Sequence, residues 1–104
     1  MTNSEKMMKG HNQVWLSGYV GGKILFSNTR SGEPAFSFGI SSEDSGDNVT
    51  WVRVNAYGQM AVDCRDSLAK GVYCQVLGEL MNRSGKFGEL TEVRAKDVVF
   101  YPAV

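Results

Sequence analysis

The stretch TWVRVNAYG, from Thr50 to Gly58, places functional side chains at every second position: Trp51, Arg53, Asn55 and Tyr57. The residues between them are small and apolar: Val52, Val54 and Ala56. Successive side chains of a β-strand point to opposite faces, so the pattern predicts a strand with one apolar face and one face of rings, guanidinium and amide. The apolar face suits a core, and the other face needs a separate explanation.

Single-stranded nucleic acid is a ligand that this second face would suit. Bases stack on aromatic rings at about 1–3 kcal/mol each, and cationic side chains follow the phosphates. The alternative is structural, because aromatic residues are common in strands and Trp51 and Tyr57 could cover one end of a barrel. Since the alternate positions already supply core residues, we favour a binding face.

Catalytic and metal-binding interpretations find little support in the sequence. GYVGGKI resembles a phosphate-binding loop, but Ser17 stands at its first glycine position and Ile24 where a metal-binding hydroxyl is required. His11 is the only histidine, and two cysteines with one histidine do not make a four-ligand zinc site. We therefore expect a non-catalytic protein with no metal, no cofactor and no small-molecule substrate.

Composition indicates one ordinary globular domain. The chain has 104 residues, 42% hydrophobic and 21% charged, with 11 basic and 11 acidic side chains. A net charge of zero gives no indication of a nucleic-acid partner, although basic side chains can still gather on one face of such a protein. No apolar run is long enough to span a membrane, and MTNSEKMMKGHN lacks the apolar centre of a signal peptide, so we expect a cytoplasmic protein. Cys64 and Cys74 are then expected to be free and buried.

Alternating short segments predict an all-β fold. Strands are expected over residues 13–20 with an extension at 23–26, and over 34–41, 50–58, 72–80 and 90–101, with a loop at 82–89. Residues 59–71 break the period of two and predict one helix, with Gly71 at its end. This order favours a five-stranded Greek-key barrel of the OB type with one short helix between strands three and four. We expect residues 1–11 to form a flexible arm and residues 12–104 the OB domain.

Four sequence blocks carry a family resemblance. They are NQVWLSGYVG, PAFSFGIS, TWVRVNAYGQMA and AKGVYCQVLGELMNR. In order and spacing they resemble blocks of the bacterial single-stranded DNA-binding proteins, including that family's Thr-Glu-Trp-x-x-Val-x-Phe-Gly-Lys-Leu-Ala. The resemblance covers residues 12–101. It implies an OB fold that binds single-stranded DNA in replication, recombination or repair.

The resemblance also implies roles for individual residues. Trp51 and Tyr57 would stack on bases, and Phe26 is similar in placement to a family tyrosine. Phe87 would substitute for a family tryptophan that is missing after the fourth strand, and Asn55 shares the binding face. Cations expected around the groove, some of them on phosphates, are Lys23, Arg30, Arg53, Arg83, Lys86, Arg94 and Lys96.

Two departures from the family leave alternatives open. The loop SEDSGDN has no tryptophan, and the chain ends at Val104 without an acidic tip that recruits other proteins. Either a tail was trimmed, or this is a compact member, like phage-encoded forms or the primosomal protein PriB. The rival interpretation is a PriB-like protein-interaction subunit of a replication assembly, and RNA is a further possible ligand.

Outward-facing apolar residues predict self-association. Trp15 and Tyr19 on the first strand and Tyr73 and Leu77 on the fourth point away from the expected core. Two such rows would form a patch that needs a partner. We expect a homo-oligomer, a tetramer first and a dimer second; the alternative is that the helix, the arm or a loop covers these residues.

Overall fold

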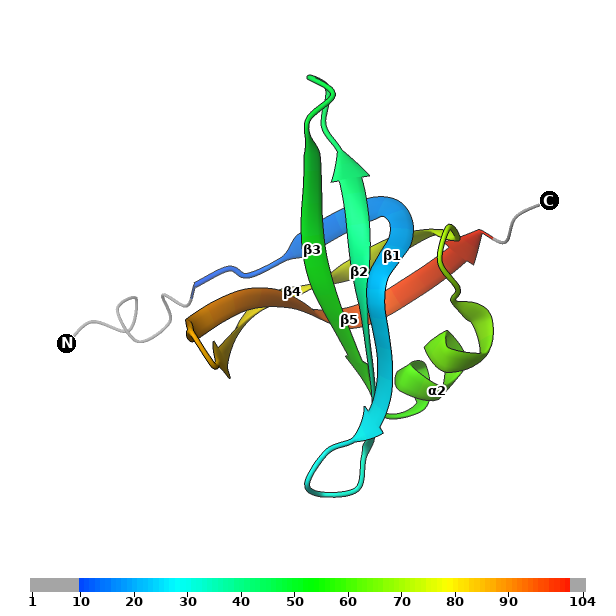
Figure 1. Cartoon of the computed structure of the whole chain (residues 1–104), viewed down its shortest axis with the longest axis vertical. Helices are drawn as coiled ribbons and strands as arrows, with labels where there is room; N and C mark the ends of the chain where they lie inside the picture. Colours follow the sequence, from blue (N-terminus) through cyan, green and yellow to red (C-terminus); the bar gives the residue numbers. More distant parts are fainter. Residues whose placement is uncertain (1–9, 102–104) are drawn as a thin grey trace, which may run out of the picture.

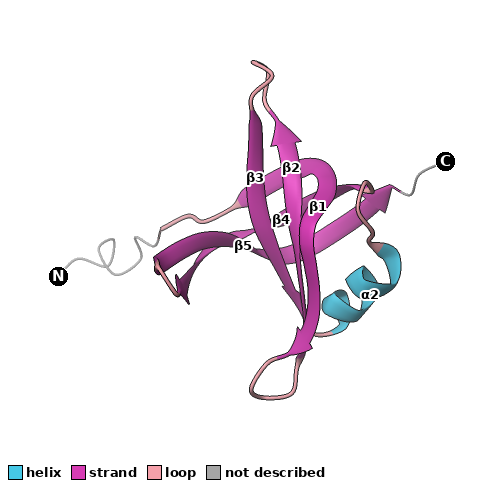
Figure 2. Ribbon diagram, viewed as in Figure 1, coloured by secondary structure: helices cyan, strands magenta, loops and turns pink. Residues whose placement is uncertain are grey.

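The computed structural model describes residues 10–101, and most of the expected N-terminal arm lies outside them, as does the stretch 102–104. Five strands and one helix follow one another along the chain (Figure 1, Figure 2). Their order is β1 (Val14–Asn28), β2 (Pro34–Glu43), β3 (Val49–Tyr57), α2 (Gln59–Ser67), β4 (Tyr73–Gly85) and β5 (Gly88–Tyr101).

The strands form a closed barrel in the order β1-β2-β3-β5-β4. Every pairing is antiparallel except that of β3 with β5, which is parallel. The predicted five-stranded barrel with one short helix between the third and fourth strands is confirmed. The helix lies against one end of the barrel, while the β2–β3 and β4–β5 hairpins extend away from it (Figure 1).

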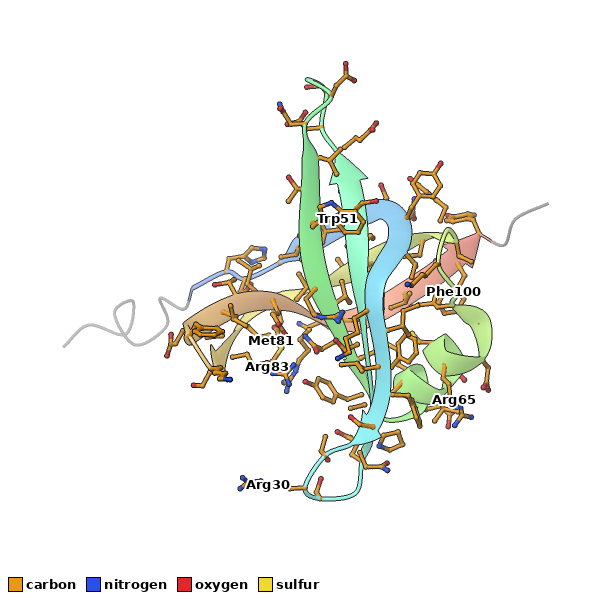
Figure 3. All side chains as sticks on the ribbon, in the orientation of Figure 1. Arg30, Trp51, Arg65, Met81, Arg83 and Phe100 are labelled. Carbon is orange, nitrogen blue, oxygen red and sulfur yellow. The ribbon has the colours of Figure 1, made fainter. Side chains whose placement is uncertain are left out.

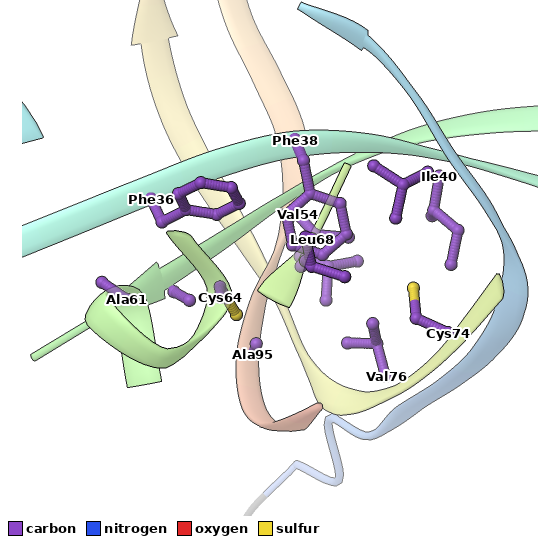
Figure 4. Packing of buried hydrophobic residues seen from close by; sticks show 13 residues of the cluster. Phe36, Phe38, Ile40, Val54, Ala61, Cys64, Leu68, Cys74, Val76 and Ala95 are labelled. Atoms are coloured by element: carbon purple, nitrogen blue, oxygen red, sulfur yellow. The ribbon is translucent and has the colours of Figure 1, made fainter. Parts of the chain in front are cut away.

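The core is built from the inward positions of the strands and one face of α2 (Figure 4). Phe38, Ile40 and Val54 are fully buried at its centre. Cys64 and Cys74 are free and buried beside them, as the sequence predicted. Burial raises the pKa of the Cys64 thiol to about 12 and that of Cys74 to about 11, so both thiols stay protonated at neutral pH.

Strand β1 is long enough to serve both sides of the barrel. Its first half pairs with β4 and its second half with β2, and the register with β2 shifts between Gly21 and Leu25. Gly18 lies where the backbone of β2 crosses closely, since a Cβ there would collide with the carbonyl group of Ser41. The single predicted segment and its extension are therefore one bent strand.

Two local predictions were wrong. The helix ends at Ser67, and Gly71, with φ 89°, lies in the turn that leads into β4. The stretch 82–89 is not a loop, because β4 and β5 stay paired until Gly85 meets Gly88, leaving a two-residue turn. Its polar side chains reflect a hairpin that projects into solvent on both faces, where backbone pairing outweighs turn-like composition.

Candidate nucleic-acid interface

Trp51 lies on the outer face of the barrel, with its ring over two glycines. We call these two residues, Gly21 and Gly39, the glycine bed. The Trp51 ring reaches from β3 over Gly39 of β2 to Gly21 of β1: a Cβ at Gly21 would lie 3.1 Å from ring atoms Cη2 and Cζ3, and one at Gly39 would lie 3.8 Å from Cε3. No side chain separates this ring face from the sheet. The ring nevertheless remains 62% exposed, so its other face is open to a ligand (Figure 3).

Arg53, two residues further along the same face, is tied to the irregular part of β1. Its Nη1 and Nη2 donate hydrogen bonds of 2.6 and 2.5 Å to the carbonyl oxygen of Lys23. The Lys23 side chain itself is exposed. These bonds fix the guanidinium against β1, and it has further N–H donors.

Beyond Arg53 the face opens into a groove of about 580 Å³. One wall comes from β1 and the start of the β1–β2 loop, the other from the β4–β5 hairpin, and β2 and β3 form the floor. Leu25, Met81 and Leu90 give it apolar sides, while Tyr57 closes the end of β3. A space of this size and lining is typical of a ligand site.

The floor of the groove carries a buried polar cluster. Asn55 is on the predicted face, but it is only 4% exposed, and its Nδ2 donates to Glu92 Oε1 at 2.8 Å. The same oxygen lies 3.5 Å from Arg83 Nη1. The hydroxyl of Ser37, opposite Asn55 in the register, is buried and has no hydrogen-bond partner.

Tyr57, which packs against Arg94, is the second aromatic ring of the interface. The Arg94 guanidinium lies 5.3 Å from the centre of the Tyr57 ring, a cation–π contact that β5 makes possible by running parallel to β3. Trp51 and Tyr57 are six residues apart, which is about 20 Å along a strand. The outer face of β3 therefore offers two rings with cations between and beside them.

Three further predicted residues lie at the tips of the hairpins that border the groove. Arg30 is exposed at the end of the β1–β2 loop (Figure 3). Lys86 and Phe87 form the turn of the β4–β5 hairpin, where Phe87 is 96% exposed and the Lys86 ammonium lies 5.9 Å from its ring. These side chains border the groove rather than line it.

Two predicted residues lie away from the others. Phe26 pairs with the core residue Phe36 and points to the helix side of the sheet, where the Arg65 guanidinium lies 4.8 Å from its ring. Lys96 forms an ion pair with Glu79 at 3.4 Å, beside residues 10–13. The structure does not bring either residue together with Trp51 and Tyr57.

Sequence reasoning missed Leu25, Ser37 and Glu92. The signal for Leu25 was present, because it shares its parity on β1 with Tyr19 and Gly21, which face outward, whereas Phe26 shares that of Val20 in the core. Ser37 and Glu92 carried no comparable signal. Only the closure of the β4–β5 hairpin over β3 buries them together.

The family comparison decides the identity of this barrel. The family model described as "Single-strand binding protein family" matches residues 11–101. The chain belongs to this family. Its members are non-catalytic binders with an OB fold, so the chain is an OB-fold binding protein and not an enzyme. Among the curated proteins, none matches the sequence.

Solved structures agree on the fold. One similar structure is titled as the dimeric structure of the N-terminal domain of the PriB protein from Thermoanaerobacter tencongensis. It aligns with a TM-score of 0.74 at 22% identity, over 88% of this chain and 98% of the PriB chain. At this identity the likeness establishes a shared architecture.

Between residues 10 and 101, no group of three or more His, Cys, Asp and Glu side chains is arranged to hold a metal ion. In the same range no helix is long and apolar enough to cross a membrane.

Proposed function

We propose that the protein binds single-stranded DNA in the cytoplasm, with little sequence preference, during replication, recombination or repair. The observation that carries this proposal is the open ring face of Trp51, supported from beneath by Gly21 and Gly39. A large exposed ring on a rigid bed loses little freedom when a flat base stacks on it. Membership of the single-strand binding protein family supports the same ligand.

In this proposal the strand runs along β3 and through the groove. Bases stack on Trp51 and Tyr57, and Arg53 lies between them. Phosphates are neutralised by a subset of the surrounding cations, with Arg83 and Arg94 nearest to the groove and Arg30 and Lys86 at its rims. Asn55 takes part indirectly, because its amide holds Glu92 in the floor.

The test is a titration with a single-stranded thymidine oligomer, followed by tryptophan fluorescence. Binding should quench the emission, and Trp51→Ala should weaken affinity by about 1–3 kcal/mol. Trp15→Phe is the matched control, since Trp15 lies on β1 beside Leu77, and most of the quench should remain. A folded Trp51→Ala protein with unchanged affinity would contradict the proposed site.

We also propose that the protein is a homo-oligomer, a tetramer or, failing that, a dimer. The four residues expected in an interface support this, because Trp15 pairs with Leu77 and Tyr19 with Tyr73 in adjacent strands. Tyr73 contacts both Tyr19 and Tyr101, with ring centres 5.2 and 5.7 Å apart. We call the surface formed by Trp15, Tyr19, Tyr73, Leu77, Val99 and Tyr101 the apolar face.

A protein-interaction subunit, similar in role to PriB, is the second candidate. It is favoured by the absence of an aromatic residue in the β2–β3 loop and by the balanced charge of the chain. Such a subunit could use the apolar face without needing Trp51. The salt dependence of DNA binding separates the two candidates.

We further propose that the OB domain begins at Asn12, since its side chain forms two hydrogen bonds of 2.8 Å with the backbone of Leu80.

A further inference from the structure

Glu92 is a buried carboxylate whose hydrogen-bonding capacity is only partly used. It is 6% exposed, lines the groove, and uses Oε1 for both Asn55 and Arg83. Within residues 10–101, no hydrogen bond or ion pair involves Oε2. A carboxylate has about four acceptor positions, and a buried one is costly unless donors satisfy them. A donor supplied from the groove would therefore be favourable.

The hydroxyl of Ser37 adds a second unused polar group to the same floor. It is buried without a partner and lies opposite Asn55, the residue that holds Glu92. A hydroxyl can donate or accept, whereas a carboxylate can only accept. The Ser37 hydroxyl is covered by protein atoms, so the floor offers a ligand one acceptor, Glu92, between the apolar walls formed by Leu25 and Met81.

We propose that this floor reads the edge of one base and prefers a base with an exocyclic amino group, such as cytosine, to uracil or thymine. The inference rests on the proposed function. The N4 amine of cytosine would donate to Glu92 Oε2. In a single strand this edge is free for such contacts, and a carboxylate accepting from cytosine N4 is an established pairing.

The charge of Glu92 explains both halves of the preference. Uracil and thymine present a carbonyl oxygen where cytosine has its amine, and their one edge donor, N3–H, lies between two carbonyl oxygens, so the carboxylate would be repelled by these acceptors. A phosphate would be repelled as well, which turns the base rather than the backbone toward the floor.

The test compares the full chain on two single-stranded oligomers of equal length, one of deoxycytidine and one of deoxyuridine. The wild type should bind the deoxycytidine oligomer at least about fivefold more tightly, the lower end for one good base contact. In Glu92→Gln the preference should fall below about twofold, mainly through tighter binding of deoxyuridine. Glu89→Gln, an exposed acid near the hairpin tip, is the matched control and should keep the wild-type ratio.

Ser37→Ala provides a second control that leaves the buried charge in place. It should keep the wild-type ratio, because the hydroxyl is covered and does not reach the base, and circular dichroism should verify that each variant is folded. Equal binding of both oligomers by the wild type, or a preference that survives unchanged in Glu92→Gln, overturns the inference while leaving the proposed function intact. If Glu92→Gln does not fold, the wild-type ratio decides. Failure to bind either oligomer removes both proposals.

Discussion

Gly21→Val tests whether the bed beneath Trp51 matters for binding. A Cβ at this position would come within 3.1 Å of two atoms of the indole ring, whereas carbon atoms in ordinary contact are about 3.5–4.0 Å apart. The ring must therefore move by about 0.4–0.9 Å for a methyl group, and further for the two methyls of valine. Since the outer face of the ring is open, it can lift away without disturbing the core.

The expected result is a loss of affinity with little loss of stability. A tilted ring stacks poorly, so binding of a thymidine oligomer should weaken by about 1–2 kcal/mol, or roughly 5–30-fold. The free energy of unfolding should change by less than about 1 kcal/mol, because valine suits a strand and residue 21 has no left-handed backbone to preserve. Fluorescence titration and urea unfolding measure the two quantities.

The double variant makes the test specific. If the valine acts through the ring, Gly21→Val should have no further effect on affinity in a Trp51→Ala background, because the two changes remove the same interaction. Unchanged affinity in Gly21→Val, or an equal loss in both backgrounds, would refute the idea that these glycines serve the ring.

Three other predictions follow from the structure. The logarithm of the affinity should fall with the logarithm of salt concentration by about 0.7 for each phosphate neutralised, and a slope of zero would favour the protein-interaction candidate. Light scattering after size exclusion should find an oligomer that Leu77→Glu, on the apolar face, converts to a monomer; a wild type that is already monomeric at tens of micromolar contradicts this. The buried thiols should destabilise the protein in alkali, because folding raises the pKa of Cys64 from 9.0 to about 12 and that of Cys74 to about 11. Their contribution is complete below pH 9 and declines as the pH rises through 9 toward 11, by about 1.4 kcal/mol per thiol at pH 10. Urea unfolding at pH 8 and pH 10 should find a smaller difference in Cys64→Ala than in the wild type.

The fold was predictable because alternation and the core agree along most of the chain. Phe36, Phe38 and Ile40 alternate with small residues, and these positions are buried in the barrel as expected. The ends of elements were less predictable. The β4–β5 hairpin reads as a loop because both its faces are polar, and nothing local reveals that backbone pairing continues to Gly85.

The candidate site was predictable where one strand supplies it and unpredictable where several do. Trp51, Arg53 and Tyr57 share a face because they alternate along β3, which period two alone establishes. The burial of Asn55 depends instead on Glu92, 37 residues further along the chain. The bed under Trp51 likewise joins β1, β2 and β3, so the glycines acquire their role only from the register.

The neutral net charge and the proposed DNA-binding face are compatible because the charges are distributed unequally. Arg53, Arg83 and Arg94 lie in or beside the groove, where Glu92 is the acid at the floor. Other acids lie at the far end of the β2–β3 hairpin, where backbone N–H groups of Asn48 and Gly46 donate to Asp44 and lower its pKa. That loop stays negative at neutral pH and repels phosphates from the far end of the hairpin. Affinity along β3 must then depend more on ring stacking than on bulk charge, which is why the support of a single tryptophan should have a measurable effect.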